Sequence, residues 1–178
     1  GTALKRIEQL IQSMLKITRI DAGSISFEKS NYSIPNILNH AISELTTRAN
    51  NEKKEIVING DLEQMLYCDI EWTGEAIGNI VKNALDHTDV GGKITISWER
   101  TPAMIRIYIT DNGHGIDQED IHHIFKRFYR SKNTSDSQGI GLGLPLAKVI
   151  VEEQGGVLSV QSERLQGTTF TLSFLTES

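Results

Sequence analysis

Two neighbouring segments with alternating apolar residues constrain the fold most strongly. KITISWER covers residues 93–100 and AMIRIYIT covers residues 103–110, so that only Thr101 and Pro102 separate them. An apolar residue at every second position is typical of a strand that buries one face, and so short a connection favours an antiparallel hairpin. The chain must therefore build a sheet with one buried face, which other segments have to cover.

The remaining segments predict the helices that cover this face and the other strands of the sheet. Ser33 and Pro35 mark a helix start, as an N-cap and a first-turn proline. Helical spacing of apolar residues predicts helices over 2–21, 35–51, 70–86 and 144–154, and a short helix over 117–128. Further strands are expected over 24–34, 55–60, 157–163 and 168–175, with 62–69 strand-like or irregular and 129–142 a mobile loop. The fold class is therefore α+β: a two-layer α/β sandwich with a mixed, mostly antiparallel sheet covered by helices on one face, plus an N-terminal helix.

Composition narrows the class of protein. A chain of 178 residues, 38% hydrophobic and 23% charged, is typical of one globular domain with a sizeable core. A net charge of -5 gives no overall attraction to nucleic acid, and a single cysteine excludes a disulfide framework. No apolar run approaches the roughly 20 residues of a membrane helix.

The helix expected over residues 2–21 has an unusually broad apolar face. Leu4, Ile7, Ile11 and Met14 follow helical spacing, and further apolar residues lie beside them. Such a face either packs on its own domain or meets a partner helix in a bundle or coiled coil. We favour the partner helix.

Three polar or glycine-rich stretches stand out against this framework. In GIGLGL, residues 139–144, glycines alternate directly before a helix, where free backbone N–H groups favour an anion. On one helix face, Asn79 and Asn83 lie one turn apart, and amide oxygens suit Mg²⁺. In TDNGHGI, residues 110–116, Asp111 ends a strand before two glycines, so that its carboxylate can accept a hydrogen bond from an exocyclic amine. Taken singly, each has a plainer explanation: a hinge, two solvated amides and an Asx-turn.

Together, and in their chain order of asparagine helix, Asp111 loop and GIGLGL, the stretches resemble the catalytic, ATP-binding part of a bacterial sensor histidine kinase. EAIGNIVKNALDHT resembles the asparagine box, DNGHGI the first glycine box, FKRFYR the phenylalanine box and GIGLGL the second glycine box of that family. QGTTF, residues 166–170, resembles its last glycine-containing box. Residues 1–23 resemble the second helix of the dimerisation and phosphoacceptor hairpin, in an incomplete form, and residues 24–178 resemble the ATP-binding catalytic domain.

The resemblance implies a set of roles for residues of this chain. Asp111 would accept the adenine amine, with Gly113 and Gly115 shaping the pocket, and Asn83 would be the Mg²⁺ ligand and a catalytic residue, supported by Asn79. Arg130 would be the second catalytic residue, reaching phosphate from the lid. The implied nucleotide-binding set is Asn79, Asn83, His87, Asp111, Gly113, Gly115, Ile116, Arg130, Gly139, Gly141, Leu142, Gly143, Leu144 and Thr168.

The asparagine box departs from the family pattern at its end. The family often has Lys-Tyr where this chain has Asp86 and His87, and an aspartate cannot neutralise phosphate. We therefore assign neutralisation to Arg130, while Lys126, Arg127 and Lys132 are weaker candidates that fit a solvated basic face. For His87, a nucleotide contact and a polar helix end are both open. For Phe125 and Phe128, two interpretations are also open: they anchor the lid, or they are simple core residues.

The resemblance also implies an activity and its partners. The activity would be transfer of the ATP γ-phosphoryl group to a histidine, which depends on positioning and on charge neutralisation. The acceptor histidine of the family is followed by Glu or Asp, and none of the five histidines here is. We therefore expect the acceptor on a dimerisation helix outside this chain. The chain itself would bind ATP and Mg²⁺ without being phosphorylated.

In the full-length protein the resemblance implies a homodimer, a response regulator as partner, and a cytoplasmic domain of a protein anchored in the plasma membrane by an upstream segment. The alternatives are an ATPase or serine kinase of the same fold, and a degenerate module that only binds nucleotide or docks partners.

Overall fold

The computed structural model of the protein describes residues 1–129 and 142–176. Its helices are α1 (Thr2–Asp21), α2 (Ile34–Asn51), α3 (Ile70–Asp86), α4 (Gln118–Ile121) and α5 (Gly143–Glu153). Its strands are β1 (Ser30–Ser33), β2 (Glu55–Asn59), β3 (Met65–Cys68), β4 (Lys93–Arg100), β5 (Met104–Asp111), β6 (Val157–Glu163) and β7 (Gly167–Leu175). None of the helices in these two ranges is long and apolar enough to cross a membrane.

The sheet has the predicted mixed, mostly antiparallel character. Its five strands run in the order β2-β4-β5-β7-β6, and only the β2–β4 pair is parallel. The predicted hairpin is confirmed, because β4 and β5 pair antiparallel with Trp98 opposite Ile107. A separate two-stranded ribbon joins β1 and β3.

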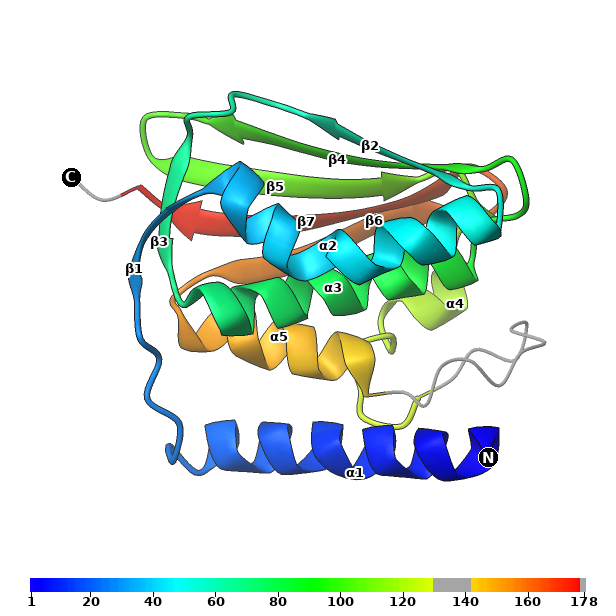
Figure 1. Ribbon diagram of the computed structural model, residues 1–178, viewed down its shortest axis with the longest axis horizontal. Coiled ribbons are helices and arrows are strands. Elements are labelled where there is room, and N and C mark those ends of the chain that lie inside the picture. The colour runs from blue at the N-terminus through cyan, green and yellow to red at the C-terminus, as the bar shows by residue number, and fades with distance from the viewer. Residues whose placement is uncertain (130–141, 177–178) are drawn as a thin grey trace.

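Helices α2, α3 and α5 lie side by side on one face of the sheet and enclose the core (Figure 1). The inward residues of β4, β5 and β7, among them Ile96, Ile107 and Phe170, are fully buried against them. The outward residues alternate with these and are polar or only partly buried, as expected for an antiparallel sheet with one open face. The predicted two-layer sandwich is therefore confirmed.

Helix α1 forms a further layer beneath α5 (Figure 1). Its C-terminal half packs on the domain, with Ile17 and Ile20 each 2% exposed. Its N-terminal half leaves Leu4, Ile7 and Ile11 more than half exposed, at 58%, 53% and 51%. Packing on its own domain is therefore confirmed for the C-terminal half alone, and a partner helix for the N-terminal half stays a prediction.

Two predicted elements are shorter than expected. The strand predicted over residues 24–34 is limited to β1, because β3 offers partners only to Ser30–Ser33. The helix predicted over 117–128 is limited to α4, after which the chain makes tight turns, with His123 N–H bonded to Asp120 C=O and Lys126 N–H to His123 C=O. Phe128 then has a φ of 66°, which a helix does not accept. Most of the loop predicted over 129–142 lies outside the described residues.

Candidate functional site

Helix α3 carries the paired asparagines on the side that faces away from the sheet. Its N-cap, Asp69, accepts hydrogen bonds from Glu71 N–H at 3.1 Å and Trp72 N–H at 3.0 Å, which fixes where the helix begins. Asn79 and Asn83 are only partly buried, one turn apart near the helix end. The Asn79 Nδ2 donates to the carbonyl of Gly143 at 3.2 Å, so that α3 is tied to the start of α5.

Asp111 is the last residue of β5, and its side chain is buried at 4% exposure. Burial raises the pKa of this carboxyl from 3.8 to about 6, although hydrogen bonds from the backbone N–H groups of Gly113 and Thr168 oppose that rise. The bond from Gly113 N–H to Oδ1 is 2.9 Å long and forms the Asx-turn that the sequence left open. A carboxylate has about four acceptor positions, so this turn leaves capacity for another donor.

The glycines after Asp111 permit close contact between chain segments. A Cβ on Gly113 would lie 2.1 Å from the His87 carbonyl oxygen, and a Cβ on Gly115 would lie 2.0 Å from that of Glu163. Gly115 also has a φ of +75°, which a side chain rarely accepts. The loop is therefore pressed between the end of α3 and the β6–β7 turn, which is the immediate physical reason for two glycines here.

Ser162 holds this loop to the sheet, a role that the sequence analysis did not predict. Its Oγ accepts a hydrogen bond from Ile116 N–H at 2.7 Å and donates to Gly167 C=O at 2.9 Å. The same oxygen lies 2.8 Å from the Oγ1 of Thr168, which is buried and stands opposite Asp111 in the β5–β7 register. Ser162 belongs to an ordinary alternating strand, so no pattern in the sequence distinguishes it.

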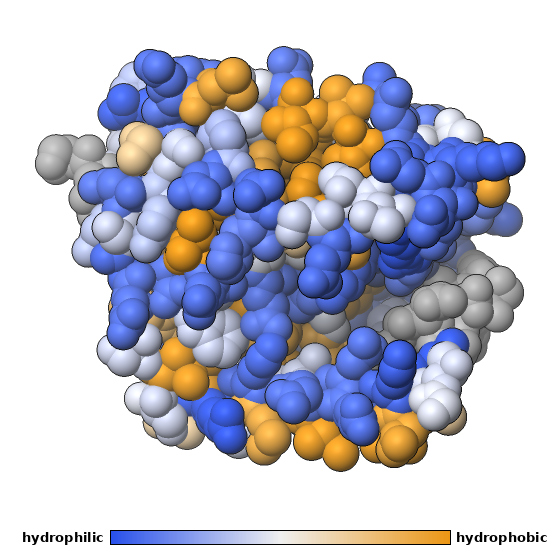
Figure 2. All heavy atoms as spheres, in the orientation of Figure 1, coloured by the Kyte–Doolittle hydropathy of each residue, from blue (hydrophilic) through white to orange (hydrophobic). Residues whose placement is uncertain are grey.

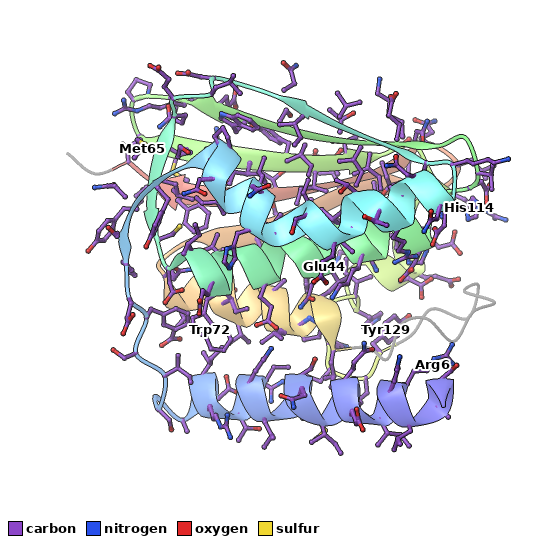
Figure 3. All side chains as sticks on the ribbon, viewed as in Figure 1. Arg6, Glu44, Met65, Trp72, His114 and Tyr129 are labelled. Carbon is purple, nitrogen blue, oxygen red and sulfur yellow. The ribbon has the colours of Figure 1, made fainter. Side chains whose placement is uncertain are left out.

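Asp86 and His87, which stand where the family often has Lys-Tyr, lie in different surroundings at the end of α3. Asp86 turns to α2, where it forms an ion pair with Arg48 at 2.6 Å. His87, the C-cap of α3, is partly buried, which lowers the pKa of its imidazole below 6.5 and leaves the ring neutral at pH 7. Its carbonyl accepts from His114 N–H at 3.2 Å, so the end of α3 and the Asp111 loop are joined. Figure 3 shows His114 at this end of the molecule.

The start of α5 completes the described part of the site. Leu142 is 1% exposed and Leu144 packs against the core, so these two anchor the junction by burial. The N-cap residue of α5, Leu142, makes no side-chain hydrogen bond to the first turn, so among the described residues the backbone N–H groups there are suited to binding an anion. Arg130, Lys132, Gly139 and Gly141 lie outside the described residues.

The aromatic and basic segment before residue 130 has two different kinds of residue. Phe125 packs edge-on against Phe170 with ring centroids 6.2 Å apart, as a core residue, whereas Phe128 is 53% exposed. Core packing is therefore the correct interpretation for Phe125 and the wrong one for Phe128. Arg127 is not simply solvated, because it forms an ion pair with Asp21 of α1 at 2.5 Å.

Comparison with known proteins identifies the family of the chain. Residues 68–178 match the family described as histidine kinase-, DNA gyrase B-, and HSP90-like ATPase. The chain is 31% identical over 170 residues to the sensor protein SrrB of Staphylococcus aureus (strain NCTC 8325 / PS 47), covering 94% of this chain and 29% of SrrB. It therefore spans less than a third of that relative's length.

Solved structures agree on the fold. Full-length ShkA in complex with AMPPNP aligns with a TM-score of 0.83 at 20% identity, over 97% of this chain and 36% of that one. Histidine kinase ThkA in complex with response regulator protein TrrA aligns with a TM-score of 0.77 at 20% identity, over 99% of this chain and 49% of that one. Since the family match covers α3, the Asp111 loop and α5, the chain belongs to the histidine kinase-, DNA gyrase B- and HSP90-like ATPases, as the ATPase domain of a sensor histidine kinase.

Proposed function

We propose that this chain binds ATP with Mg²⁺ and transfers the γ-phosphoryl group to a histidine on a dimerisation helix, for relay to a response regulator. The observation that carries the proposal is the buried carboxylate of Asp111, held by backbone N–H groups beside the end of the helix that bears Asn79 and Asn83. A carboxylate at 4% exposure with acceptor capacity to spare is suited to an amine donor from a flat base.

The described residues fit a nucleotide and a hard cation. Asp111 would accept the adenine amine, with Thr168 beside it in the register. The amide oxygen of Asn83 would bind Mg²⁺, and its side chain bonds to no described residue, so it is available for that role. Asn79 would support the metal and phosphates. The free N–H groups at the start of α5 would hold phosphate oxygens.

The rest of the implied nucleotide contacts remain part of the proposal. Ile116, Gly113 and Gly115 belong to the clamped loop, and Leu142, Gly143 and Leu144 to the start of α5. His87 is partly buried next to that loop, within reach of a ligand there. Gly139 and Gly141 would present backbone to the triphosphate, and Arg130 would neutralise it, in place of the lysine that Asp86 replaces.

The chemistry that we propose requires mainly positioning. Bound Mg²⁺ would neutralise charge on the phosphates. The residues of this chain would hold the base, exclude water through the buried Asp111 corner and orient the triphosphate. None of the chain's histidines is followed by an acid, so the acceptor is expected on another segment, and the chain alone should not become labelled by γ-labelled ATP. Acid-labile, base-stable label on the purified chain would contradict this.

Helix α1 supports the proposed place of the domain in a larger protein. Its exposed apolar half is suited to a partner helix, as in the dimerisation hairpin of a homodimer. The ThkA structure contains the response regulator protein TrrA, which supports a partner of that class here. We also propose that the domain is cytoplasmic and that the full-length protein is anchored in the plasma membrane.

Two alternatives can be separated from this function. A gyrase-like ATPase needs a catalytic acid where Asn79 stands, and an amide cannot act as a general base. Steady phosphate release from ATP would favour that ATPase nevertheless. Failure to bind nucleotide would favour a degenerate docking module.

Replacing Asp111 tests the proposed site directly. Asp111→Asn keeps an acceptor for Gly113 N–H but removes the charge, so we expect binding of a fluorescent ATP analogue with Mg²⁺ to weaken about 10- to 100-fold, the range for a lost hydrogen bond to a charged group. Circular dichroism should show an unchanged fold. Asp89→Asn, a change at an exposed aspartate that pairs with His114, is the control and should bind normally. Equal affinity of both variants would contradict the assignment.

A further inference from the structure

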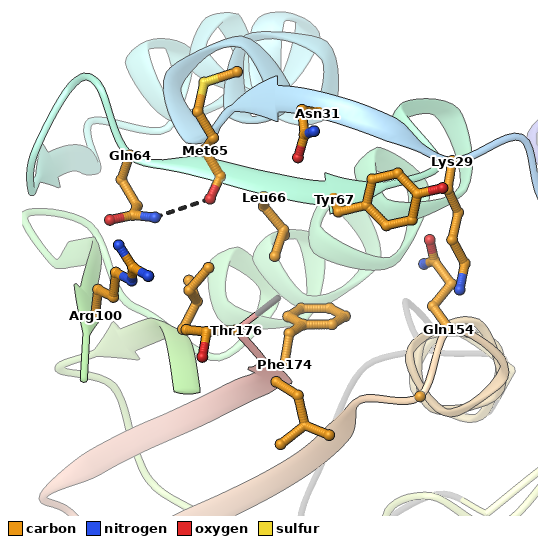
Figure 4. A pocket seen from close by; sticks show the side chains of 13 residues that line it. Lys29, Asn31, Gln64, Met65, Leu66, Tyr67, Arg100, Gln154, Phe174 and Thr176 are labelled. Carbon is orange, nitrogen blue, oxygen red and sulfur yellow. Dashed lines mark hydrogen bonds between the residues drawn. The ribbon is translucent and has the colours of Figure 1, made fainter. Parts of the chain in front are cut away.

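A groove lies at the end of the molecule opposite to the candidate nucleotide site (Figure 4). It has a volume of about 390 Å³, and its floor is apolar, with Leu66, Ile105 and Phe174 at 2%, 7% and 4% exposure. Ile105 stands near the start of β5 and Asp111 at its end, so the two sites are separated by roughly 20 Å of extended strand. Figure 3 shows the two ends, marked by Met65 and by His114.

One wall of this groove is an edge of β3 that is free among the described residues, because β3 pairs there with β1 alone. Ile34 N–H donates to Gln64 C=O at 2.8 Å, so these two residues form a hydrogen-bonded pair. In an antiparallel ribbon such pairs recur at every second residue. The backbone groups of Leu66 and Cys68 therefore also point toward β1. The N–H and C=O groups of Met65 and Tyr67 therefore point to the other side. There the Gln64 side chain donates to the Met65 carbonyl at 2.9 Å, the bond drawn in Figure 4.

A second side chain closes the far end of the same edge. The Gln154 Oε1 accepts from Asp69 N–H at 2.8 Å. The edge is thus capped at both ends by glutamines, while the Met65 and Tyr67 N–H groups and the Tyr67 carbonyl lie between the caps. A row of backbone donors and acceptors of this kind is a template for another strand.

Charge selects the strand that would fit. Among the described residues 1–129 and 142–176, Lys29 and Arg100 line the groove and no Asp or Glu does, although the chain has 23 acidic against 18 basic residues. Neither cation forms an ion pair with another of the residues that the structure describes. Figure 4 shows Arg100 beside Gln64 and Lys29 beside Tyr67, at the two ends of roughly 10 Å of β3.

Apolar side chains around the groove are exposed as well. Met65, Tyr67 and Leu175 are 44%, 42% and 70% exposed. An incoming strand would cover part of this surface, since alternate side chains of an extended peptide meet the pocket that flanks the edge.

We propose that this groove binds an extended acidic peptide segment of another protein, added as a strand to the free edge of β3, with acidic side chains meeting Lys29 and Arg100. Backbone pairing would provide affinity, and the two cations would set register and select acidic over basic sequences. The proposal does not depend on nucleotide binding, because it rests on the opposite end of the sheet.

The test uses the whole chain and a synthetic peptide, Glu-Thr-Val-Thr-Glu with blocked ends. We expect saturable binding by NMR titration, with the amide signals of Met65 and Tyr67 shifting most. The matched peptide Lys-Thr-Val-Thr-Lys should bind at least tenfold more weakly. The acidic peptide with N-methylated backbone amides should also bind at least tenfold more weakly, because strand addition needs the backbone N–H donors. Equal binding of either control peptide would overturn the proposal.

Charge reversal in the protein gives an independent measurement. Lys29→Glu with Arg100→Glu should weaken binding of the acidic peptide at least tenfold and favour the basic one. Lys5→Glu with Arg19→Glu changes net charge equally on exposed positions of α1 and should leave both affinities unchanged. Sedimentation gives a further outcome. If the native chain forms a dimer and only the Lys29→Glu, Arg100→Glu variant is monomeric, the β3 edge pairs with a second copy of the chain and the proposal is overturned.

Discussion

Asp111 has two opposing properties that meet in one side chain. The carboxylate is almost fully buried, which costs free energy in its charged form, yet the proposed role needs that charge to accept an amine. The hydrogen bonds from Gly113 and Thr168 N–H offset only part of the cost, since the pKa remains at about 6. A destabilising charge kept in a fold in this way is typical of a functional site.

The pH dependence of stability should reveal this cost. Between pH 3.8 and about 6 the folded state keeps a proton on Asp111 that the unfolded chain releases, so this residue's contribution to the free energy of unfolding falls as pH rises through that window. Above pH 6 the loss is complete, at most on the order of 3 kcal/mol. Asp111→Asn should therefore be more stable than the native protein at pH 7, and the difference should shrink toward pH 4.

Denaturant unfolding at several pH values measures this effect. Asp89→Asn again provides the control, since Asp89 lies at the surface and its removal should give a difference that stays within about 0.5 kcal/mol. An Asp111→Asn variant that is less stable than the native protein at pH 7 would show that the carboxylate stabilises the fold.

Among the elements, α1 is the one whose two halves differ most. The C-terminal half is held by burial of Ile17 and Ile20 and by ion pairs from Lys16 to Glu75 and from Asp21 to Arg127. These pairs are partly exposed, so each contributes at most about 1 kcal/mol, and burial provides most of the attachment.

Alanine substitutions along α1 should separate the two halves. Ile17→Ala removes a buried side chain and should lower the free energy of unfolding by about 2–4 kcal/mol. Ile11→Ala, at 51% exposure on the same helix, is the matched control and should cost less than about 1 kcal/mol. Denaturant unfolding measures both, and equal losses would mean that α1 is not docked as the structure shows.

At the scale of the whole molecule, exposed apolar side chains gather along the outer side of α1 (Figure 2). Leu4, Ile7, Ile11, Met14 and Leu15 are each more than 40% exposed, at 58%, 53%, 51%, 43% and 43%. A contiguous apolar surface of this kind marks an interaction site, and helical spacing makes another helix its natural partner.

The isolated chain should therefore self-associate through α1. Sedimentation should show a dimer whose fraction rises with protein concentration, and Ile7→Gln with Ile11→Gln should make the chain monomeric without unfolding it. The control is Leu62→Gln, at an equally apolar position that is 69% exposed elsewhere on the surface. A native chain that remains monomeric at high concentration would contradict this prediction.

Most of the fold could be predicted from the sequence, because its signals are local. The alternation in β4 and β5 and the spacing in α1, α2 and α3 reflect which face of each element is buried, and Ser33 caps α2 as its type predicts. Prediction failed for residues 24–34 and 117–128, where the extent of an element is limited by its partner strand or by turns.

The candidate site likewise has residues that the sequence could indicate and contacts that it could not. Asp111, Asn79 and Asn83 stood out by residue type and position, whereas Thr168 was named only through the family resemblance, and the roles of all four stay predictions. Ser162, the carbonyl of His87 and the Arg48–Asp86 pair could not be predicted, because each acts on a residue far along the chain.

The sequence by itself therefore determined most of the secondary structure, the α+β class and the residue types that a nucleotide site needs. Only the tertiary structure decided that the two glycines serve close packing against α3 and the β6–β7 turn, that Asp86 is neutralised from α2, and that β3 leaves an edge free between two cations. The physical reason is range: helix and strand periodicity arises within a few residues, whereas burial, ion pairing and strand-edge exposure depend on which distant segments the fold brings together.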